Sequence, residues 1–344
     1  MKYRLLTLVA LVVALVSCDN QDVEFDDFGT TAVFFPFQTP ARTLILGNYE
    51  RGINENDNNS RFEIGVSMSG VYTNDIDRQV GFRVAPELLE NVENVMALPE
   101  NYYTIETTSP VTIPTGSITG RISIQLNEAF FKDTLSFAPR RRVNYVVPLL
   151  ITDIQNLDTL LVGLPEFGFS NPSRVNDDEW EILPKDYTLY GIKFINKYEA
   201  IYLRRGVDVA TDEFNETVVT EYRAEFVVRD ELVKAFTSGE NAVELSNRVR
   251  RAGQSPGNAN FELVFDEDGN CTISSFEDDI FNVTGTGRFV EDGDTWGGKL
   301  RDVIYLDYSY ADPVFNETHS VKDTLVVRNR DVVFEQFSID LLDD

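Results

Sequence analysis

The sequence predicts an all-β protein made of two antiparallel domains with one short helix. Apolar and polar residues alternate with a period of two in many short segments, and these segments are rich in β-branched and aromatic side chains. Gly, Asn, Asp or Pro bounds each segment. Apolar residues make up 42% of the chain, which is enough to fill two cores and excludes a disordered chain.

The first 18 residues have the order of a bacterial lipoprotein signal. Lys2 and Arg4 precede an apolar run of about a dozen residues, which is too short to span a bilayer core of roughly 30 Å as a helix. Residues 15–18 read Leu-Val-Ser-Cys, the form of a lipobox. We therefore expect cleavage before Cys18 and a diacylglycerol on its sulfur, because acyl chains at about 0.8 kcal/mol per buried methylene give a lasting membrane anchor.

Residues 19–30 are acidic and contain few apolar groups, which predicts a flexible tether after the anchor. The whole chain has a net charge of −27. Phosphate binding needs clustered Lys and Arg, so this charge argues against nucleic acid as a partner. It also argues against electrostatic docking on anionic lipid.

Residues 31–166 predict a β-sandwich, because several short strands recur there at regular spacing. The expected strands are 31–37, 42–46, 62–68, 80–84, 119–125 and 143–151. The alternation lapses over residues 167–185, where Asn, Asp, Pro and Ser favour turns. We therefore expect the domain linker at 167–185.

Residues 186–344 predict a second antiparallel domain of roughly eight strands, either a calycin-like barrel or a sandwich. The expected strands are 187–194, 200–205, 217–223, 261–265, 271–274, 281–289, 302–308 and 324–328. Residues 230–236 repeat apolar side chains at helical spacing after two acids, and they supply the expected helix.

Metal and thiol chemistry have few candidate residues. Cys271 has no second Cys beside it once Cys18 is lipidated, which predicts that the fold has no intrachain disulfide. The single His, His319, lies in a polar stretch that indicates a solvated hairpin loop, so we expect neither a zinc site nor a catalytic triad. The acidic segments 266–270 and 54–60 favour a turn and a mobile loop. We expect no metal or cofactor, with Ca²⁺ as the alternative that carboxylates leave open.

Saccharide binding matches the composition better than catalysis does. A sugar ring has an apolar face and a polar rim, so it needs an exposed aromatic plate beside hydrogen-bonding side chains. Trp296 and Trp180 are the first candidates for such a plate, because Gly and acidic residues flank the former and acids flank the latter. Tyr102 and Tyr103 are further candidates, since one of two successive strand residues faces outward. The alternative for each ring is packing in a core or a domain interface.

Three polar neighbours of Trp296 complete the expected saccharide site, namely Asp294, Lys299 and Arg301. Glycoside hydrolysis would need a specific pair of carboxylates. The chain has 57 acidic residues and no motif that singles out a pair, so we expect no enzyme activity.

Asp-Thr-Leu occurs three times, at residues 133–135, 158–160 and 323–325. It resembles the O-glycosylation sequon of exported Bacteroidota proteins, which makes Thr134, Thr159 and Thr324 candidate modification sites.

Several ordered motifs resemble one family over nearly the whole chain. They lie at residues 98–103 (Leu-Pro-Glu-Asn-Tyr-Tyr), 111–116, 198–206, 285–287, 296–299 and 326–330. The chain resembles the two-domain surface lipoproteins of Bacteroidota encoded beside SusC/SusD-type outer-membrane uptake pairs. The resemblance implies an immunoglobulin-like first domain, an outer-membrane location facing the cell exterior, and capture of glycan for a SusC/SusD-like transporter.

The sequence therefore favours a surface lipoprotein that binds polysaccharide or oligosaccharide without catalysis. The alternative is a structural or adhesive envelope protein, such as a fimbrial or complex-assembly component, that binds other proteins. An exposed aromatic platform would favour the first function, and a long exposed edge strand would favour the second.

Overall fold

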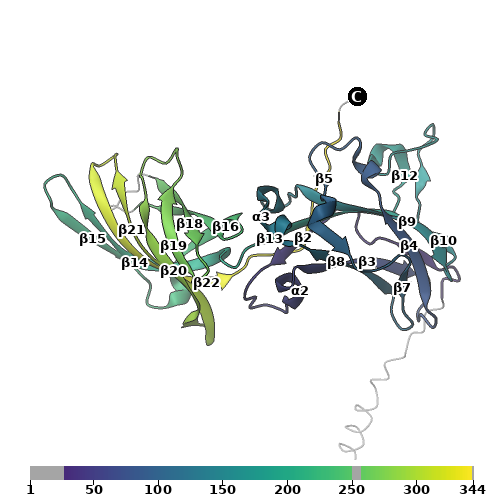
Figure 1. Ribbon diagram of the computed structural model, residues 1–344, viewed down its shortest axis with the longest axis horizontal. Helices are drawn as coiled ribbons and strands as arrows, with labels where there is room; N and C mark the ends of the chain where they lie inside the picture. The colour runs from purple at the N-terminus through teal and green to yellow at the C-terminus, as the bar shows by residue number, and fades with distance from the viewer. Residues whose placement is uncertain (1–26, 250–256, 343–344) are drawn as a thin grey trace, which may run out of the picture.

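A computed structural model describes residues 27–249 and 257–342, and it confirms an all-β chain of two domains (Figure 1). Cys18 and the signal segment lie outside the described residues. The helices in the described ranges are short, and none has the length and apolarity of a membrane span.

The first domain contains two main sheets. The smaller sheet runs in the order β10 (Thr159–Leu160), β1 (Ala32–Phe34), β3 (Arg61–Ser69), β8 (Thr119–Leu126) and β6 (Tyr103–Ile105). The larger runs in the order β23 (Glu335–Gln336), β2 (Pro40–Ile45), β13 (Tyr187–Ile195), β9 (Tyr145–Gln155), β4 (Arg78–Val84) and β7 (Val111–Ile113), with β5 (Met96–Ala97) beside β9. Inward residues of both sheets, such as Ile64 and Val147, share one core. The immunoglobulin-like topology of this domain stays a prediction.

Short elements complete the first domain. They are α2 (Glu55–Asn58), η1 (Pro86–Leu89), η2 (Glu100–Tyr102), α3 (Glu128–Lys132), η3 (Thr134–Ser136), η4 (Asp177–Glu179) and the paired strands β11 (Leu164–Pro165) and β12 (Trp180–Ile182).

The second domain is a closed barrel, which decides between the two predicted architectures. Its eight strands run in the order β14 (Ala200–Thr211), β16 (Glu231–Gly239), β17 (Ala242–Arg248), β18 (Asn258–Phe265), β19 (Asn270–Ser275), β20 (Thr284–Trp296), β21 (Lys299–Asp312) and β22 (Glu317–Asn329). β22 pairs antiparallel with β14 and closes the ring. β15 (Thr217–Tyr222) extends β14 on the outside, and η5 (Val227–Arg229) follows it.

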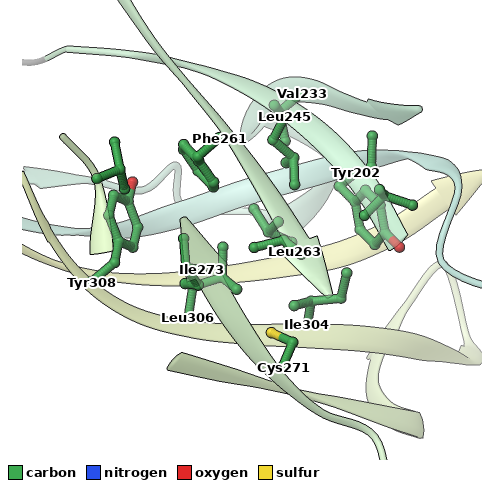
Figure 2. Packing of buried hydrophobic residues seen from close by; sticks show 14 of the residues in the cluster. Tyr202, Val233, Leu245, Phe261, Leu263, Cys271, Ile273, Ile304, Leu306 and Tyr308 are labelled. Atoms are coloured by element: carbon green, nitrogen blue, oxygen red, sulfur yellow. The ribbon is translucent and has the colours of Figure 1, made fainter. Parts of the chain in front are cut away.

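Along each barrel strand, inward and outward side chains alternate, and the inward ones fill the barrel. In β18, Phe261 and Leu263 are fully buried, whereas Glu262 between them faces outward. Figure 2 shows these two side chains in one core with Tyr202 and Leu306 from other strands. Cys271 is free and lies in the same core, where burial raises the pKa of its thiol to about 12.

The predicted helix at residues 230–236 is wrong, because this segment forms strand β16. Val233 and Ala235 point into the core, while Leu232 and Phe236 are exposed on the outer face. Apolar side chains on both faces of a strand imitate helical spacing, which misled the sequence interpretation.

The domain junction differs from the predicted linker. β13 pairs with β2 and β9 of the first domain, and the chain returns to that domain after β22, where β23 pairs with β2 (Figure 1). Residues 167–185 also belong to the first domain, because Arg174 forms an ion pair with buried Asp186 and Val175 joins its core. The junction lies at Asn196 and at Arg330.

Arg330 fixes the two domains together. Its side chain is 2% exposed, and its guanidinium donates hydrogen bonds to the carbonyl oxygens of Lys197 (2.6 Å) and Glu199 (2.7 Å). It also donates to the carbonyl oxygen of Leu46 in the first domain. Desolvation by burial lowers the pKa of this guanidinium.

Candidate binding groove on the barrel

The outer face of β16 and its neighbours carries the candidate site. Because Val233, Ala235 and Thr237 face the core, Lys234 and Phe236 must face outward. Phe236 is 43% exposed, a high value for a large aromatic ring on a strand. Its cross-strand partner on β17 is Glu244, which is also exposed.

Two adjoining cavities meet at Phe236 and Glu244, and we call them together the Phe236 groove. One cavity, of about 610 Å³, lies over the ends of β17 and β18. The other, of about 620 Å³, lies at the domain junction. Binding sites occur preferentially at domain interfaces, and cavities of this volume hold small ligands.

Apolar surface and hydrogen-bonding groups alternate in the cavity over β17 and β18. Phe276 (38% exposed) and Ile280 (57% exposed) form an apolar wall beside the exposed amide side chains of Asn258 and Asn260. Asp279 fixes this wall to β18, because its Oδ2 accepts a hydrogen bond from the backbone N–H of Asn260 at 2.7 Å.

Cations line the junction cavity. Lys234 Nζ lies 4.6 Å from the centroid of the Phe236 ring and 3.2 Å from Asp331 Oδ2. Lys193 is buried, and its Nζ donates to Glu335 Oε2 (2.9 Å) and to the carbonyl oxygen of Pro139 (2.9 Å), which makes it a structural residue of the cavity floor.

Glu199 is the acid of the junction cavity whose pKa departs from its ordinary value. Desolvation by burial raises the pKa of its carboxyl above 4.5, although the backbone N–H of Thr237 donates to Glu199 Oε2 at 2.8 Å. The groove is therefore acidic at its β17–β18 end and of mixed charge at the junction.

This arrangement suits a saccharide. An exposed aromatic ring can pack against the apolar face of a sugar, while carboxylates and amides nearby can accept and donate to its hydroxyl rim. The sequence interpretation missed Phe236 because it placed the residue in a helix. The signal was available in the strict alternation of residues 242–248 on the partner strand.

Trp296 does not offer a free plate. Its ring packs against the small apolar cluster of Leu203, Val303 and Val326, and its Nε1–H donates to the carbonyl oxygen of Val327 at 2.9 Å. The guanidinium of Arg301 lies 4.5 Å from the ring centroid. The packing alternative therefore holds for Trp296, and Arg301 is occupied with the same ring.

Asp294 and Lys299 lie on the β20–β21 hairpin with Trp296, whereas the remaining aromatic members of the predicted saccharide site lie in the first domain. Asp294 is half-buried and its Oδ1 accepts from the backbone N–H of Thr295, while Lys299 is exposed at the β20–β21 hairpin. Trp180 lies in the first domain on β12, far from the barrel (Figure 1). It is half-buried, and its Nε1–H donates to the carbonyl oxygen of Ser173 at 2.7 Å.

Tyr102 and Tyr103 are both half-buried against the first core, so neither stands free as the strand argument expected. Tyr102 lies in η2, where its hydroxyl donates to Asp133 Oδ2 at 2.9 Å. Tyr145 donates to the same oxygen at 2.6 Å.

The three candidate glycosylation threonines differ in exposure. Thr134 is exposed in η3, whereas Thr159 and Thr324 are half-buried on β10 and β22. The preceding aspartates serve structural hydrogen bonds, since Asp158 accepts from Thr31 and Asp323 accepts from buried Arg204. Thr134 therefore has the accessibility that a modifying enzyme requires.

The two segments considered for Ca²⁺ have local structural partners. Asp266 accepts from the backbone N–H of Asn270 at 2.8 Å, and Gly269 has a φ of +79°, so the predicted turn between β18 and β19 is confirmed. Residues 54–60 do not form the predicted mobile loop. They contain α2, because buried Asp57 accepts from the backbone N–H of Ile45 at 2.9 Å and holds the segment to β2.

His319 does not lie in a solvated loop. It is 1% exposed on β22 inside the barrel, so the predicted hairpin loop is wrong at this position. The polar residues around it misled the interpretation because they alternate outward on the same strand, at Thr318 and Ser320.

Comparisons with known proteins agree with this division of the chain. The profile of a domain of unknown function, DUF5627, matches residues 197–331, which is the barrel, and a profile described only as an N-terminal domain matches residues 25–158. No curated protein matches the chain.

Two solved structures are similar to this chain. A Bacteroides ovatus protein of unknown function is 33% identical with a TM-score of 0.81, and the match covers 92% of this chain and 100% of that one. An auxiliary nutrient binding protein from Bacteroides thetaiotaomicron is 13% identical with a TM-score of 0.37, over 83% of this chain and 90% of that one, a likeness too low to carry an argument. The chain belongs to the family of the Bacteroides ovatus protein, a Bacteroidota family whose barrel domain is DUF5627.

Proposed function

We propose that the protein is a lipid-anchored surface protein that binds oligosaccharide or polysaccharide in the Phe236 groove without cleaving it. The observation that carries this proposal is the exposed Phe236 ring at the meeting point of two cavities lined by carboxylates, amides and a lysine. A groove open along the outer barrel face suits a chain of sugars, because a long ligand can extend past both ends of the contact.

The lipobox at Cys18 and the acidic segment after it support attachment to the outer membrane with the domains facing the exterior. The high negative charge supports a soluble, mutually repelling layer of such proteins. We place the protein as an accessory to a SusC/SusD-like uptake pair, in which many tethered copies raise avidity for a long glycan.

A structural or adhesive role is the second candidate, and β15 favours it. This strand pairs only with β14 in the described sheet, and it exposes Val218 (48%) and Val219 (63%). An unpaired edge with apolar side chains can accept a strand from another protein. At six residues, however, β15 is shorter than the long edge that a donor-strand adhesin needs.

Affinity electrophoresis tests the saccharide proposal. The chain from Asp19 onward is run through gels that contain a panel of plant, host and microbial polysaccharides. We expect one glycan to retard the protein and Phe236→Ala to abolish the retardation. Phe214→Ala is the matched control, because Phe214 is a 76% exposed ring at the β14–β15 hairpin, away from the groove.

If no glycan in the panel retards the protein, the result contradicts the proposal and favours protein binding at β15. Retardation that survives Phe236→Ala but is lost in Trp296→Phe would return the site to the β20–β21 hairpin.

A further inference from the structure

The barrel holds a buried polar cluster at the end of β21 and the start of β22, made of residues that do not line the Phe236 groove. Asp312 ends β21, Glu317 begins β22, and the two are cross-strand partners. His319 follows two residues later, so its side chain lies on the same inner face as Glu317. A hairpin thus brings a ring nitrogen and two carboxylates together.

The ligand atoms of the three residues lie close enough to share one ion. A ring nitrogen of His319 and one carboxylate oxygen each of Asp312 and Glu317 all lie within 4.8 Å of one another, and Nε2 is 3.8 Å from Glu317 Oε2. Protein ligands lie about 2.0–2.2 Å from a zinc-like cation, so two ligands of one ion are at most about 4.4 Å apart. Small side-chain rotations bring the three atoms within that limit.

Two of these atoms are buried without a hydrogen-bond partner in the described ranges. They are His319 Nε2 and Asp312 Oδ2, and each residue is 1% exposed. The other oxygen of Asp312 accepts from the backbone N–H groups of Val314 (2.9 Å) and Phe315 (3.3 Å), which holds the carboxylate in place. Buried unpaired polar atoms are costly, so two that converge on one point indicate a missing partner.

The far side of the histidine is already prepared for a metal ligand. His319 Nδ1 lies 2.7 Å from Asp208 Oδ1, and Asp208 Oδ2 accepts from the hydroxyl of Tyr310 at 2.9 Å. Tyr310 also stacks on the imidazole, with ring centroids 4.3 Å apart. A carboxylate that accepts the Nδ1 proton leaves a lone pair on Nε2 and fixes the ring, which is the usual outer shell of a metal-binding histidine.

The charges of the cluster also call for a cation. Asp208 and Asp312 bring two buried carboxylates into the barrel, and no Lys or Arg of the described residues forms an ion pair with either of them. Buried carboxylates are normally paired with an opposite charge or coordinate a metal ion.

We propose that Asp312, Glu317 and His319 bind one divalent transition-metal cation of the zinc type, with Asp208 as the residue that orients His319. An imidazole with two carboxylates suits such an ion, whereas Ca²⁺ takes six to eight oxygen ligands and does not favour nitrogen. Three protein ligands leave a fourth position for water or for a ligand group. The proposal departs from the sequence expectation of no metal, which counted Cys and His as zinc ligands and considered carboxylates only as ligands of Ca²⁺.

Calorimetric titration with ZnCl₂ tests the site on the chain from Asp19 onward, after removal of bound metal with a chelator. We expect one equivalent to bind and the thermal midpoint to rise. His319→Gln and Asp312→Asn should each weaken binding at least about 100-fold, and Asp208→Asn about 10–100-fold, the range for outer-shell residues. Asp307→Asn is the matched control, since Asp307 lies on β21 but faces outward.

Circular dichroism shows whether each variant is folded, so that a loss of Zn²⁺ binding is counted only for folded variants. A folded wild-type protein that takes up no Zn²⁺ would overturn the proposal and leave His319 as a buried structural residue that is hydrogen-bonded to Asp208. Binding that Asp307→Asn weakens as much as folded Asp312→Asn would overturn it as well, because a general acidic surface would then be the cause.

Discussion

The inside and the outside of the barrel are built by the same strands and hold opposite chemistry. On β16, Val233 and Ala235 pack in the core, whereas Lys234 and Phe236, each next in the chain, face the groove. Inside, the polar groups around Arg204 are paired with one another, whereas the cluster at His319 keeps two atoms without a hydrogen-bond partner in the described ranges. Outside, an aromatic ring and several carboxylates and amides are left open to solvent. The difference teaches that polar side chains alone do not mark a binding site. They can bind a ligand only where their hydrogen-bonding groups are not already used by the protein.

Arg204 is the centre of the interior network. It is 3% exposed and donates to Asp323 Oδ2 at 2.9 Å and to the hydroxyls of Tyr222 and Tyr308 at 3.2 Å each. Tyr308 in turn donates to Asp323 Oδ2 at 2.9 Å, and both tyrosine pKa values are raised, mainly by desolvation. This network links β14 to β22 inside the barrel and engages Arg204 and both tyrosine hydroxyls with protein partners.

The largest expected effect comes from breaking that network. Arg204→Leu leaves Asp323 buried without its cation, and we expect a loss of about 3–5 kcal/mol in the free energy of unfolding. Urea unfolding in a Trp180→Phe background measures it, because Trp296 fluorescence then reports on the barrel alone. Arg223→Leu, at an exposed arginine, is the control. Equal effects of the two substitutions would contradict the contrast between inside and outside.

A neighbouring pair of apolar residues sharpens the comparison. Leu263 is fully buried on β18, and Val264 beside it is 43% exposed. We expect Leu263→Ala to cost about 2–5 kcal/mol through lost burial and a cavity, and Val264→Ala to cost about 0.5 kcal/mol or less. The same urea titration compares them, and a costly Val264→Ala would show that this outer face is covered.

The pH dependence of Glu199 tests the junction. Its pKa is raised, so the folded state prefers the protonated carboxyl, and the wild-type protein loses this contribution as the pH rises through the folded pKa. Glu199→Gln keeps an acceptor for the Thr237 N–H and never ionises. The variant should therefore melt higher than wild type at pH 7–8, and the gap should close below the ordinary pKa of 4.5.

Thermal melts across that pH range measure the gap between variant and wild type. Glu225→Gln is the control, because Glu225 is exposed. A gap that widens as the pH falls would contradict a raised pKa for Glu199.

The smallest effect on stability is expected at Phe236. Because 43% of its surface stays exposed, Phe236→Ala should change the free energy of unfolding by about 0.5 kcal/mol or less, although it removes the proposed contact with sugar. Urea unfolding of the variant measures this. A loss above about 2 kcal/mol would mean that the ring serves packing rather than binding.

The sequence was enough to predict the fold class and most strands, because strands such as β18 alternate strictly. It failed at β16, where Leu232 and Phe236 are apolar but face outward, and at residues 167–185, where turn residues belong to an arm of the first domain. The candidate sites were harder to predict from the sequence. Phe236 is a candidate ligand contact only because residues distant in the chain form the cavities beside it. His319 is a candidate metal ligand only because Asp208, 111 residues away in the chain, orients its ring.

The most direct test of the account is hydroxyl-radical footprinting with and without the glycan that retards the protein, read by mass spectrometry for each aromatic residue. The account predicts that glycan protects Phe236 and Phe276 from oxidation and leaves Phe214 unchanged. Protection at Trp296 or Trp180 with Phe236 still fully oxidised would contradict a saccharide site in the groove.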